Sequence, residues 1–456
     1  MLGEMKAADD RHLYTTTSFT FEKGHGDWPE NQDDFFVTQW TKKGWVRGQG
    51  VFNQELPSFD KDFRASIDGM EVPLVTHEVG QYSVYPDLTE IPKYTGTLMP
   101  LNFMAVKEDL EKKGLIDKAP EYLQASGKLA AILYKEEIER AMKTPGISGF
   151  QLLDLHDFPG QGTALVGLLN AFWESKGVAN AEEFRQFSAP VVPLARFSKA
   201  VYKNNEQFTA DIEIANYSSE EINNKNIKWA LTNASGQPLQ EGIIPLTNIK
   251  IGGGNIAGKI SCSLSEVKKA ERLTLRVSIE NSSYKNTWNI WVYPATLTIE
   301  KEEIVVTDKL TETQKALAAG KTVLFNPPYQ LCAGLQGKFV PVFWSPVHFP
   351  KQAGTMGLLL DPTHKAFAHF PTEGHTNWQW WSLTTQSRTL VIDSIYQHIT
   401  PLVECVDNFA NNRRLATLFE TNCLNGKLIV CSMDLLNHQD TFPEKKQLLY
   451  SLINYM

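Results

Sequence analysis

Residues 72–81 read VPLVTHEVGQ. The first four residues suit a buried strand, His77 and Glu78 follow side by side, and a glycine then releases the chain into a polar loop. In parallel α/β barrels the active site lies at the carboxyl ends of the strands, so a carboxylate in this position has a reason to be functional. Two interpretations follow: Glu78 caps the strand at the surface, or the strand is a rigid support that holds Glu78 toward a substrate.

Further strand-like segments lie on either side of this one. They are HLYTTTSF (12–19), DDFFVTQW (33–40) and ISGFQLLDLHD (147–157). Residues 108–143 carry apolar side chains at helical spacing, and Pro145 and Gly146 end that helix. Alternation of apolar strands with helices predicts a parallel sheet that is covered by helices.

Each of these strands ends in polar or aromatic side chains. The endings are Ser18 and Phe19, Gln39 and Trp40, His77 and Glu78, and Asp154, His156 and Asp157. Side chains alternate along a strand, so His77 is expected on the opposite side from Glu78. Glu78 is therefore the candidate for the reactive group, and His77 is expected to support it from behind.

The pattern of predicted secondary structure changes after PVVPLARF (190–197). Short alternating strands joined by Asn, Ser and Gly turns predict an immunoglobulin-like β-sandwich, for which about 100 residues is the usual size. From about residue 299, strand-like runs such as KTVLFNPP and GKLIVCSMD return, and the chain closes on the helical EKKQLLYSLINYM. This part predicts an open α/β sheet. The expected domains are residues 1–196, 197–298 and 299–456.

Composition excludes several functions. The 456 residues have a net charge of −8 without basic clusters, which argues against a nucleic-acid partner. No apolar run approaches the roughly 20 residues of a membrane span, and the N-terminus of this chain shows no signal peptide. The five cysteines lack metal-ligand spacing, and no GxGxxG or phosphate-loop motif is present. Neither a metal nor a cofactor is predicted.

Two stretches of the sequence resemble a known family. They are THEVGQYSVYPDLTEIPKYTG (76–96) and ASGKLAAILYKEEIERAMKTPGISGFQLLDLHDFPGQGTALVGLLNAFWESKG (125–177). They resemble the C-terminal half of the catalytic barrel of family 2 glycoside hydrolases, the β-galactosidase and β-glucuronidase clan, in the multidomain form of gut Bacteroidetes. The resemblance implies a partial (β/α)8 TIM barrel and a carbohydrate substrate.

The resemblance also implies a retaining mechanism. One carboxylate attacks the anomeric carbon, and a second, about 5 to 5.5 Å away, protonates the leaving oxygen. The family's nucleophile, at the end of the seventh barrel strand, maps onto Glu78. The acid/base is a glutamate preceded by an asparagine, and Glu4, which follows Gly3 and lies close to the strand at His12, does not fit it.

The chain is therefore interpreted as an enzyme fragment that lacks the acid/base half of the barrel, with weak or no hydrolysis on its own. A missing N-terminal half, a partner chain or a homo-oligomer would complete it. The resemblance implies a periplasmic or secreted location for a full-length protein. The alternative is a non-catalytic carbohydrate-binding or structural module that completes a partner chain.

Further residues are candidates for binding the sugar, each with a structural alternative. Asp154, His156, Asp157 and Gln161 are expected to hydrogen-bond sugar hydroxyls, or else to serve as turn and cap residues. Gln39 and Trp40 form a stacking platform or pack at the rim. Tyr82 and Tyr85 orient Glu78 or line the pocket.

Two features of the last domain complete the predictions. Residues 364–381 contain three histidines and three tryptophans, for which docking against a neighbouring domain is preferred over a metal or sugar site. The domain resembles flavodoxin-like, glutamine-amidotransferase-like folds. Neither Cys332 nor Cys423 clearly presents the strand-to-helix elbow of an amidotransferase nucleophile, so no such activity is predicted.

Overall fold

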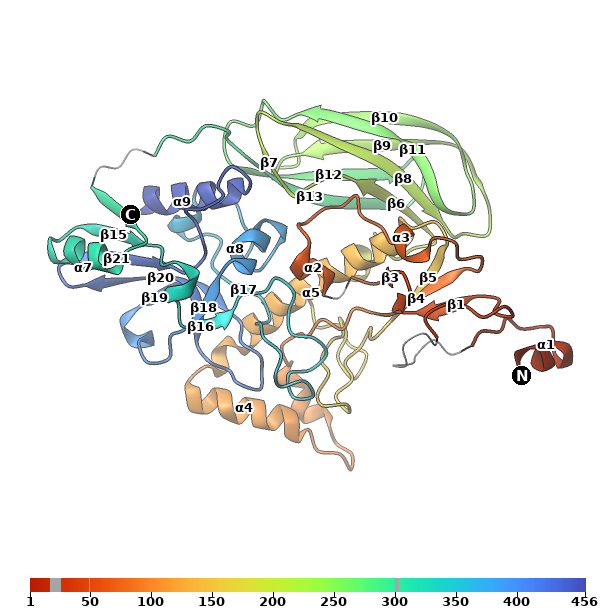
Figure 1. Ribbon diagram of the computed structural model, residues 1–456, viewed down its shortest axis with the longest axis horizontal. Coiled ribbons are helices and arrows are strands. Elements are labelled where there is room, and N and C mark those ends of the chain that lie inside the picture. The colour runs from red at the N-terminus through yellow and green to blue at the C-terminus, as the bar shows by residue number, and fades with distance from the viewer. Residues whose placement is uncertain (17–25, 49, 300–302) are drawn as a thin grey trace.

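The chain folds into several domains that are rich in β-sheet and carry some helices (Figure 1). The computed structural model describes residues 1–16, 26–48, 50–299 and 303–456. Helix α1 (Leu2–Ala8) lies at one end of the molecule and buries no side chain. None of the described helices is long and apolar enough to cross a membrane.

The first domain is built on a three-stranded parallel sheet with the order β1-β4-β5. Its strands are β1 (Phe36–Thr38), β4 (Leu74–Val79) and β5 (Ile147–Leu152). They confirm three of the predicted strands. Residues 12–16 form no strand, and Ser18 and Phe19 lie outside the described residues. Three strands do not close into a barrel, so the described chain contains no TIM barrel and the half barrel stays a prediction.

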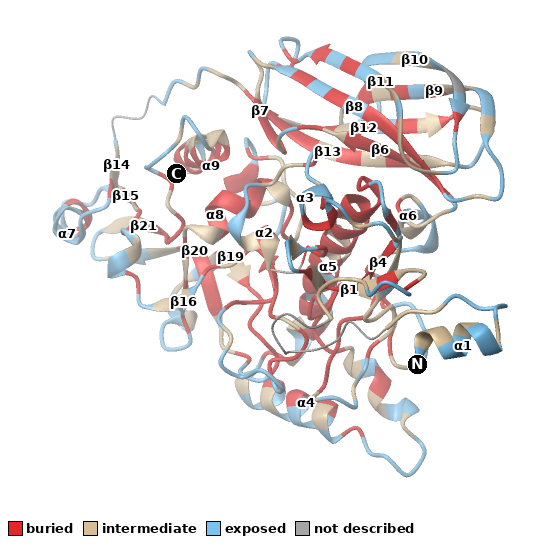
Figure 2. Cartoon of the chain, turned by 45° about the vertical axis from the view of Figure 1, so that its right-hand side comes forward, coloured by how far each residue is buried: buried red, intermediate tan, exposed pale blue. Residues whose placement is uncertain are grey.

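In the described residues, the remaining elements of this domain are two short strands, five α-helices and two 3₁₀ helices. They are β2 (Trp40–Thr41), β3 (Gly44–Trp45), α2 (Val51–Gln54), α3 (Arg64–Ile67), α4 (Leu101–Lys113), α5 (Ala119–Met142), α6 (Ala181–Arg185) and the 3₁₀ helices η1 (Leu88–Lys93) and η2 (Ile116–Lys118). Helix α5 is buried along much of its length (Figure 2). Its Leu129 and Leu133 belong to the same core cluster as Val79 of β4.

The single helix predicted over residues 108–143 is two helices, α4 and α5. Gly114 adopts a left-handed φ of 64°, and its N–H donates to the carbonyls of Leu110 and Glu111, which ends α4. Pro120 stands in the first turn of α5, where its missing N–H costs nothing. The break therefore follows from a glycine and a proline that the apolar periodicity alone did not reveal.

The second domain is a β-sandwich of a five-stranded sheet, β10-β9-β12-β13-β7, and a three-stranded sheet, β11-β8-β6. The strands are β6 (Val191–Arg196), β7 (Val201–Lys203), β8 (Gln207–Asn216), β9 (Ile222–Thr232), β10 (Pro238–Ile249), β11 (Gly252–Ser263), β12 (Glu271–Ile279) and β13 (Lys285–Tyr293). All pairings except β13 with β7 are antiparallel. The predicted sandwich is confirmed, and its immunoglobulin-like topology stays a prediction.

The C-terminal domain contains an eight-stranded sheet. Its elements are β14 (Ile304–Thr307), α7 (Leu310–Ala318), β15 (Thr322–Phe325), η3 (Tyr329–Leu331), β16 (Gly334–Gln336), β17 (Leu358–Leu359), η4 (Lys365–Phe367), η5 (Trp378–Trp380), α8 (Trp381–Thr385), β18 (Arg388–Val391), η6 (Tyr396–His398), β19 (Thr400–Cys405), β20 (Leu415–Cys423), β21 (Gly426–Cys431) and α9 (Pro443–Tyr455). Only β14, β15 and β21 run parallel to one another.

The expectation of a flavodoxin-like open parallel sheet is therefore wrong for most of this domain. Strands β20 and β21 form a tight hairpin, and β16, β17, β18 and β19 pair antiparallel. A hairpin reverses the strand without the helical crossover that a parallel sheet needs. Cys423 lies in this hairpin and Cys332 follows η3, so neither stands at a strand-to-helix elbow.

The tryptophans of residues 364–381 dock the C-terminal domain onto its neighbours. The indole N–H of Trp381 donates to the carbonyl of Phe52 at 2.6 Å. Trp378 meets Phe59 of the first domain edge-on, with ring centroids 5.5 Å apart, and stacks at 5.1 Å on Phe339 of its own domain. In the part of the chain that is described, no three His, Cys, Asp or Glu side chains gather in a way that could hold a metal ion.

Candidate active site

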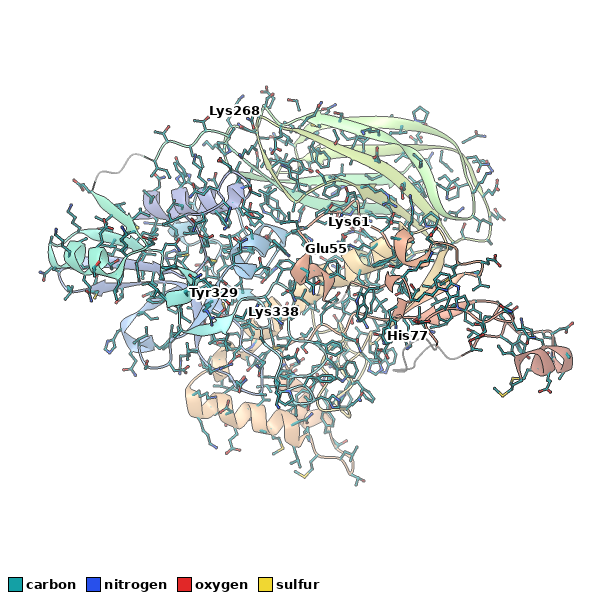
Figure 3. All side chains as sticks on the ribbon, in the orientation of Figure 1. Glu55, Lys61, His77, Lys268, Tyr329 and Lys338 are labelled. Atoms are coloured by element: carbon teal, nitrogen blue, oxygen red, sulfur yellow. The ribbon has the colours of Figure 1, made fainter. Side chains whose placement is uncertain are left out.

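Glu78 lies near the carboxyl end of β4, the central strand of the parallel sheet. Its backbone φ is 55°, in the left-handed region, and the pairing of β4 with β5 is irregular between Thr76 and Val79. This conformation breaks the alternation of side chains. Nε2 of His77 therefore lies 3.5 Å from Oε1 of Glu78, and the predicted placement of His77 on the opposite side is wrong. Figure 3 shows His77 on the side of the molecule away from the β-sandwich.

Two neutral amides hold the Glu78 carboxylate. Nε2 of Gln39 donates to Oε2 at 2.5 Å, and Nε2 of Gln81 donates to the same oxygen at 3.4 Å. The Glu78 side chain keeps 20% of its surface exposed. Among the described residues no lysine or arginine forms an ion pair with it, so the carboxylate is oriented without being neutralised by a permanent cation.

The orientation of both amides is fixed by Arg47. Its Nη1 donates to Oε1 of Gln39 at 3.0 Å and to Oε1 of Gln81 at 2.8 Å. Because a guanidinium only donates, each glutamine must turn its oxygen to Arg47 and its NH2 group away. Both NH2 groups therefore face Glu78.

Arg47 is in turn balanced by a buried carboxylate. Its Nε lies 3.5 Å from Oε1 of Glu137 on α5, and both side chains are 1% exposed. Glu137 also accepts hydrogen bonds from the backbone N–H groups of Gly48 and Gly80, at 2.9 and 3.2 Å. A buried ion pair of this kind is tolerated when hydrogen bonds surround it, and among the described residues Nε of Arg47 is the atom of this pair that has none.

Tyr82 does not line the site. Its side chain is fully buried, and its hydroxyl donates to Oε2 of Glu137 at 2.6 Å. Burial, with the nearby Glu137 charge, raises the pKa of Tyr82 well above its ordinary value. The predicted contact with substrate is therefore wrong, because Tyr82 belongs to the support behind Arg47. Tyr85 is also buried and donates to Asn412 of the C-terminal domain.

The turn after Glu78 depends on a glycine. Gly80 has a φ of 102°, and a Cβ atom added there would lie 2.4 Å from the ring of Tyr134. Any other residue would clash with this ring. Glycine thus allows the chain to bring Gln81 back under Glu78.

Two tryptophans follow Gln39 in the chain and contact each other. Trp40 follows Gln39 directly and meets Trp45 in a T-shaped contact, with ring centroids 5.6 Å apart. Trp45 is 49% exposed, and Trp40 is partly exposed. The pair lies next to Gln39 in the chain, and the predicted stacking of Trp40 on a sugar stays a prediction.

The end of β5 contributes a second group of polar side chains. Nδ1 of His77 lies 2.7 Å from Oε1 of Gln151, which links β4 to β5. Beyond β5, Oδ2 of Asp154 lies 3.6 Å from Nε2 of His156, whose ring lies 4.5 Å from that of Trp173. The structure thus brings Asp154 and His156 to the same edge of the sheet as Glu78, because β4 and β5 are parallel neighbours.

Trp173 is a candidate that sequence reasoning did not single out. Its side chain is 63% exposed although it is large and apolar. The available signal was a tryptophan in the polar stretch NAFWESKG (170–177), shortly after the predicted strand. Gln161 is exposed on a loop, and its predicted contact with a sugar stays a prediction.

Asp157 does not belong to the accessible site. Its side chain is 1% exposed and pairs at 2.6 Å with Nζ of Lys176, which is fully buried. The N–H of Gly167 donates to the same oxygen at 3.0 Å. Burial raises the pKa of Asp157 although Lys176 opposes the shift. The predicted sugar contact is wrong, and Asp157 is a structural residue.

Comparisons with known proteins cover parts of the chain. Residues 206–294 match the model of a family described as a domain of unknown function, DUF8488, and residues 305–456 match a second such family, DUF8487. No curated protein matches the sequence.

Several solved structures resemble parts of the fold at low similarity. A β-glucuronidase of Parabacteroides merdae aligns with 10% identity and a TM-score of 0.18, over 30% of this chain and 21% of that chain. The exo-chitosanase of Amycolatopsis orientalis aligns with 13% identity and a TM-score of 0.25, over 39% and 19% of the two chains. A CARDB domain of Pyrococcus furiosus aligns with 6% identity and a TM-score of 0.18, over 22% and 86%. These likenesses are too low to assign an activity.

Proposed function

We propose that this chain supplies the nucleophile of a retaining glycoside hydrolase and that Glu78 is that nucleophile. The observation that carries the proposal is the carboxylate itself, partly exposed at the carboxyl end of a parallel strand and held by two amides. The alternative of a simple strand cap does not require the buried Arg47 and Glu137 that orient these amides.

The chemistry favours this arrangement. A nucleophilic carboxylate must keep its negative charge and its direction, and neutral donors provide direction without a permanent counter-charge. Glu78 also adopts a left-handed backbone conformation, which costs a non-glycine residue roughly 1 kcal/mol or more. Such strained residues cluster at functional sites, where the surrounding structure maintains them.

The neighbouring side chains suit a sugar. Flat apolar faces with polar groups beside them match a sugar ring, and Trp45 and Trp173 are exposed at this edge. His77, Asp154 and His156 supply donors and acceptors for hydroxyl groups. We assign carbohydrate binding to this edge of the sheet.

A retaining mechanism also requires an acid/base carboxylate about 5 to 5.5 Å from the nucleophile. We propose that a polypeptide segment outside the described sheet provides it. General acid catalysis typically supplies about 10²- to 10⁴-fold in rate, so unactivated glycosides should react slowly with this chain. Glycosides whose leaving group departs without a proton should react faster.

The test compares two kinds of substrate. A panel of 2,4-dinitrophenyl β-glycosides, whose leaving group needs no protonation, is expected to be cleaved, whereas the corresponding methyl glycosides are expected to be stable. Glu78→Gln should reduce cleavage to the background rate. Glu71→Gln, an exposed glutamate at the other end of the same strand, is the matched control and should have no effect. Equal rates for Glu78→Gln and the unchanged protein would reject the assignment.

The second candidate is a non-catalytic module that completes a partner chain. The observation in its favour is that β1 and β5 are outer strands whose free edges pair with no strand in the described residues. Unpaired edges are templates for another chain. This candidate predicts sugar binding without cleavage, and identical binding by the Glu78→Gln variant.

A further inference from the structure

Two adjoining cavities run along α5, between the first domain and the other two. One, of about 770 Å³, lies between α5 and C-terminal residues such as Leu359 and Glu404. The other, of about 400 Å³, lies between α5 and the sandwich, beside Trp288. Lys128 and His375 line both cavities, so the two form one groove. Its volume and its position at domain interfaces are typical of ligand sites, and none of its lining residues belongs to the Glu78 site.

Lys128 is the unpaired charge of this groove. The other charged side chains lining the groove all have partners. Lys118 pairs with Glu121 and Glu404, Arg272 with Glu373, Lys135 with Glu139, and Glu136 with Arg140, while Glu183 and Asp361 accept hydrogen bonds from Asn180 and Thr363. Of the charged groups that line the groove in the described chain, Lys128 alone has neither an ion pair nor a hydrogen bond. The groove therefore offers one cation to a ligand.

His375 offers an acceptor beside this cation. Its Nδ1 lies 3.0 Å from the carbonyl oxygen of Thr376, and since a carbonyl only accepts, Nδ1 carries a proton. Burial lowers the pKa of His375, and the charge of Lys128 lowers it further, while the hydrogen bond to Thr376 and the charge of Glu373 oppose the shift, so the surroundings favour the neutral ring. In a neutral ring with a proton on Nδ1, the Nε2 atom is an acceptor for a hydroxyl group.

The walls of the second cavity are aromatic. Trp288, Trp291 and Trp378 line it. The indole N–H of Trp291 is buried and has no acceptor among the described residues, whereas that of Trp288 donates to Glu139.

We propose that this groove binds a ligand that carries both a carboxylate and hydroxyl groups, with the carboxylate on Lys128 and a hydroxyl on Nε2 of His375. An extended acidic saccharide is the member of this class that fills both cavities, and a free hydroxy acid would fill only a part of one. The site is non-catalytic and does not rest on the function proposed for Glu78.

Isothermal titration with the full chain tests the proposal. The probes are trigalacturonic acid, its neutral counterpart galactotriose, and gluconate as a free hydroxy acid. Trigalacturonic acid is expected to bind most tightly. Lys128→Gln should weaken its binding by about tenfold or more, because a hydrogen bond to a charged group is lost. Lys128→Arg should retain most of the affinity, and Lys112→Gln, an exposed lysine on α4, should leave it unchanged.

The outcomes separate the possibilities. Stronger binding of gluconate than of the trisaccharide would place a free hydroxy acid in the groove and overturn the saccharide assignment. Equal binding of the neutral and acidic trisaccharides, no binding of either, or no effect of Lys128→Gln would overturn the site. The groove is tested by the effect of Lys128→Gln on binding, and the hydrolase function by cleavage of dinitrophenyl glycosides, so failure of one and failure of the other give different results.

Discussion

Two carboxylates at neighbouring strand ends have opposite surroundings in this molecule. Glu78 lies near the end of the central strand β4, is held by amides and stays partly exposed. Asp157 follows β5, is almost fully buried and pairs with the buried Lys176. Both occupy positions where a barrel enzyme places functional residues. The comparison teaches that position at a strand end does not determine the surroundings of a carboxylate: amides hold Glu78 near the surface, and a lysine pairs with Asp157 in the interior.

The comparison predicts its largest effect for the buried pair. Lys176→Met leaves the Asp157 charge buried without a partner, so the free energy of unfolding should fall by about 3–5 kcal/mol. Urea unfolding measures the change, and Glu71→Gln provides the unaffected control. A loss below about 1 kcal/mol would mean that Asp157 is hydrated, and the contrast with Glu78 would disappear.

The pH dependence of stability is a second test of the difference between buried and partly exposed carboxyl groups. Burial, with the nearby charge of Asp157, raises the pKa of Glu90 to about 7, and neither Glu90 carboxylate oxygen has a hydrogen-bond partner in the described chain. The folded state then holds a proton that the unfolded state has lost between pH 4.5, the ordinary value, and pH 7. The free energy of unfolding should therefore fall as the pH rises through this window, by up to about 3 kcal/mol.

Glu90→Gln removes this titration. The variant should be at least as stable as the unchanged protein at pH 8 and should lose the pH dependence attributed to this residue. Glu444, with its pKa raised by burial to about 7 as well, contributes a second transition in the same window. The double variant Glu90→Gln, Glu444→Gln therefore shows how much of the pH dependence comes from all other groups. If the free energy of unfolding fell with pH as steeply in both variants as in the unchanged protein, the buried state of these carboxyl groups would be contradicted.

A smaller effect is expected behind Glu78. Tyr82→Phe removes the hydroxyl that donates to Glu137, and a hydrogen bond to a charged group contributes about 1.5–3 kcal/mol. Thermal unfolding should report this loss. Since Tyr82 touches Arg47 and Glu78 only through Glu137, cleavage of dinitrophenyl glycosides should change less than stability does. A complete loss of cleavage in a folded Tyr82→Phe variant would mean that Tyr82 contacts the substrate.

The smallest change in stability is expected for Glu78 itself. Glu78→Gln keeps one oxygen to accept from Gln39, so the free energy of unfolding should change by less than about 1 kcal/mol. Chemical denaturation of Glu78→Gln and Lys176→Met under the same conditions compares their free energies of unfolding directly. If Glu78→Gln cost as much as Lys176→Met, Glu78 would be a structural residue like Asp157.

Much of the fold follows from local patterns in the sequence. Strands β1, β4 and β5, the sandwich and helix α9 lie where apolar periodicity predicts them. The C-terminal sheet differs because periodicity reveals strands but not their direction, which the hairpin between β20 and β21 sets.

The site was predictable to a lesser extent. Position at strand ends singled out both Glu78 and Gln39, and a hydrogen bond joins these two side chains. Position could not reveal the support by Arg47 and Glu137, because these residues meet only through tertiary packing of α5 against the sheet. Tyr82 is buried against Glu137 of α5, and Asp157 is buried with Lys176 and Gly167; both incorrect assignments arise because these contacts are tertiary.

Covalent trapping tests the central claim most directly. The chain is incubated with 2,4-dinitrophenyl 2-deoxy-2-fluoro-β-glycosides of galactose, glucose and glucuronic acid, and the peptides are mapped by mass spectrometry. The account predicts one fluoroglycosyl adduct, on Glu78, that is absent from the Glu78→Gln variant and present in Glu71→Gln. An adduct on another residue, or a protein that stays unmodified by all three reagents, would contradict it.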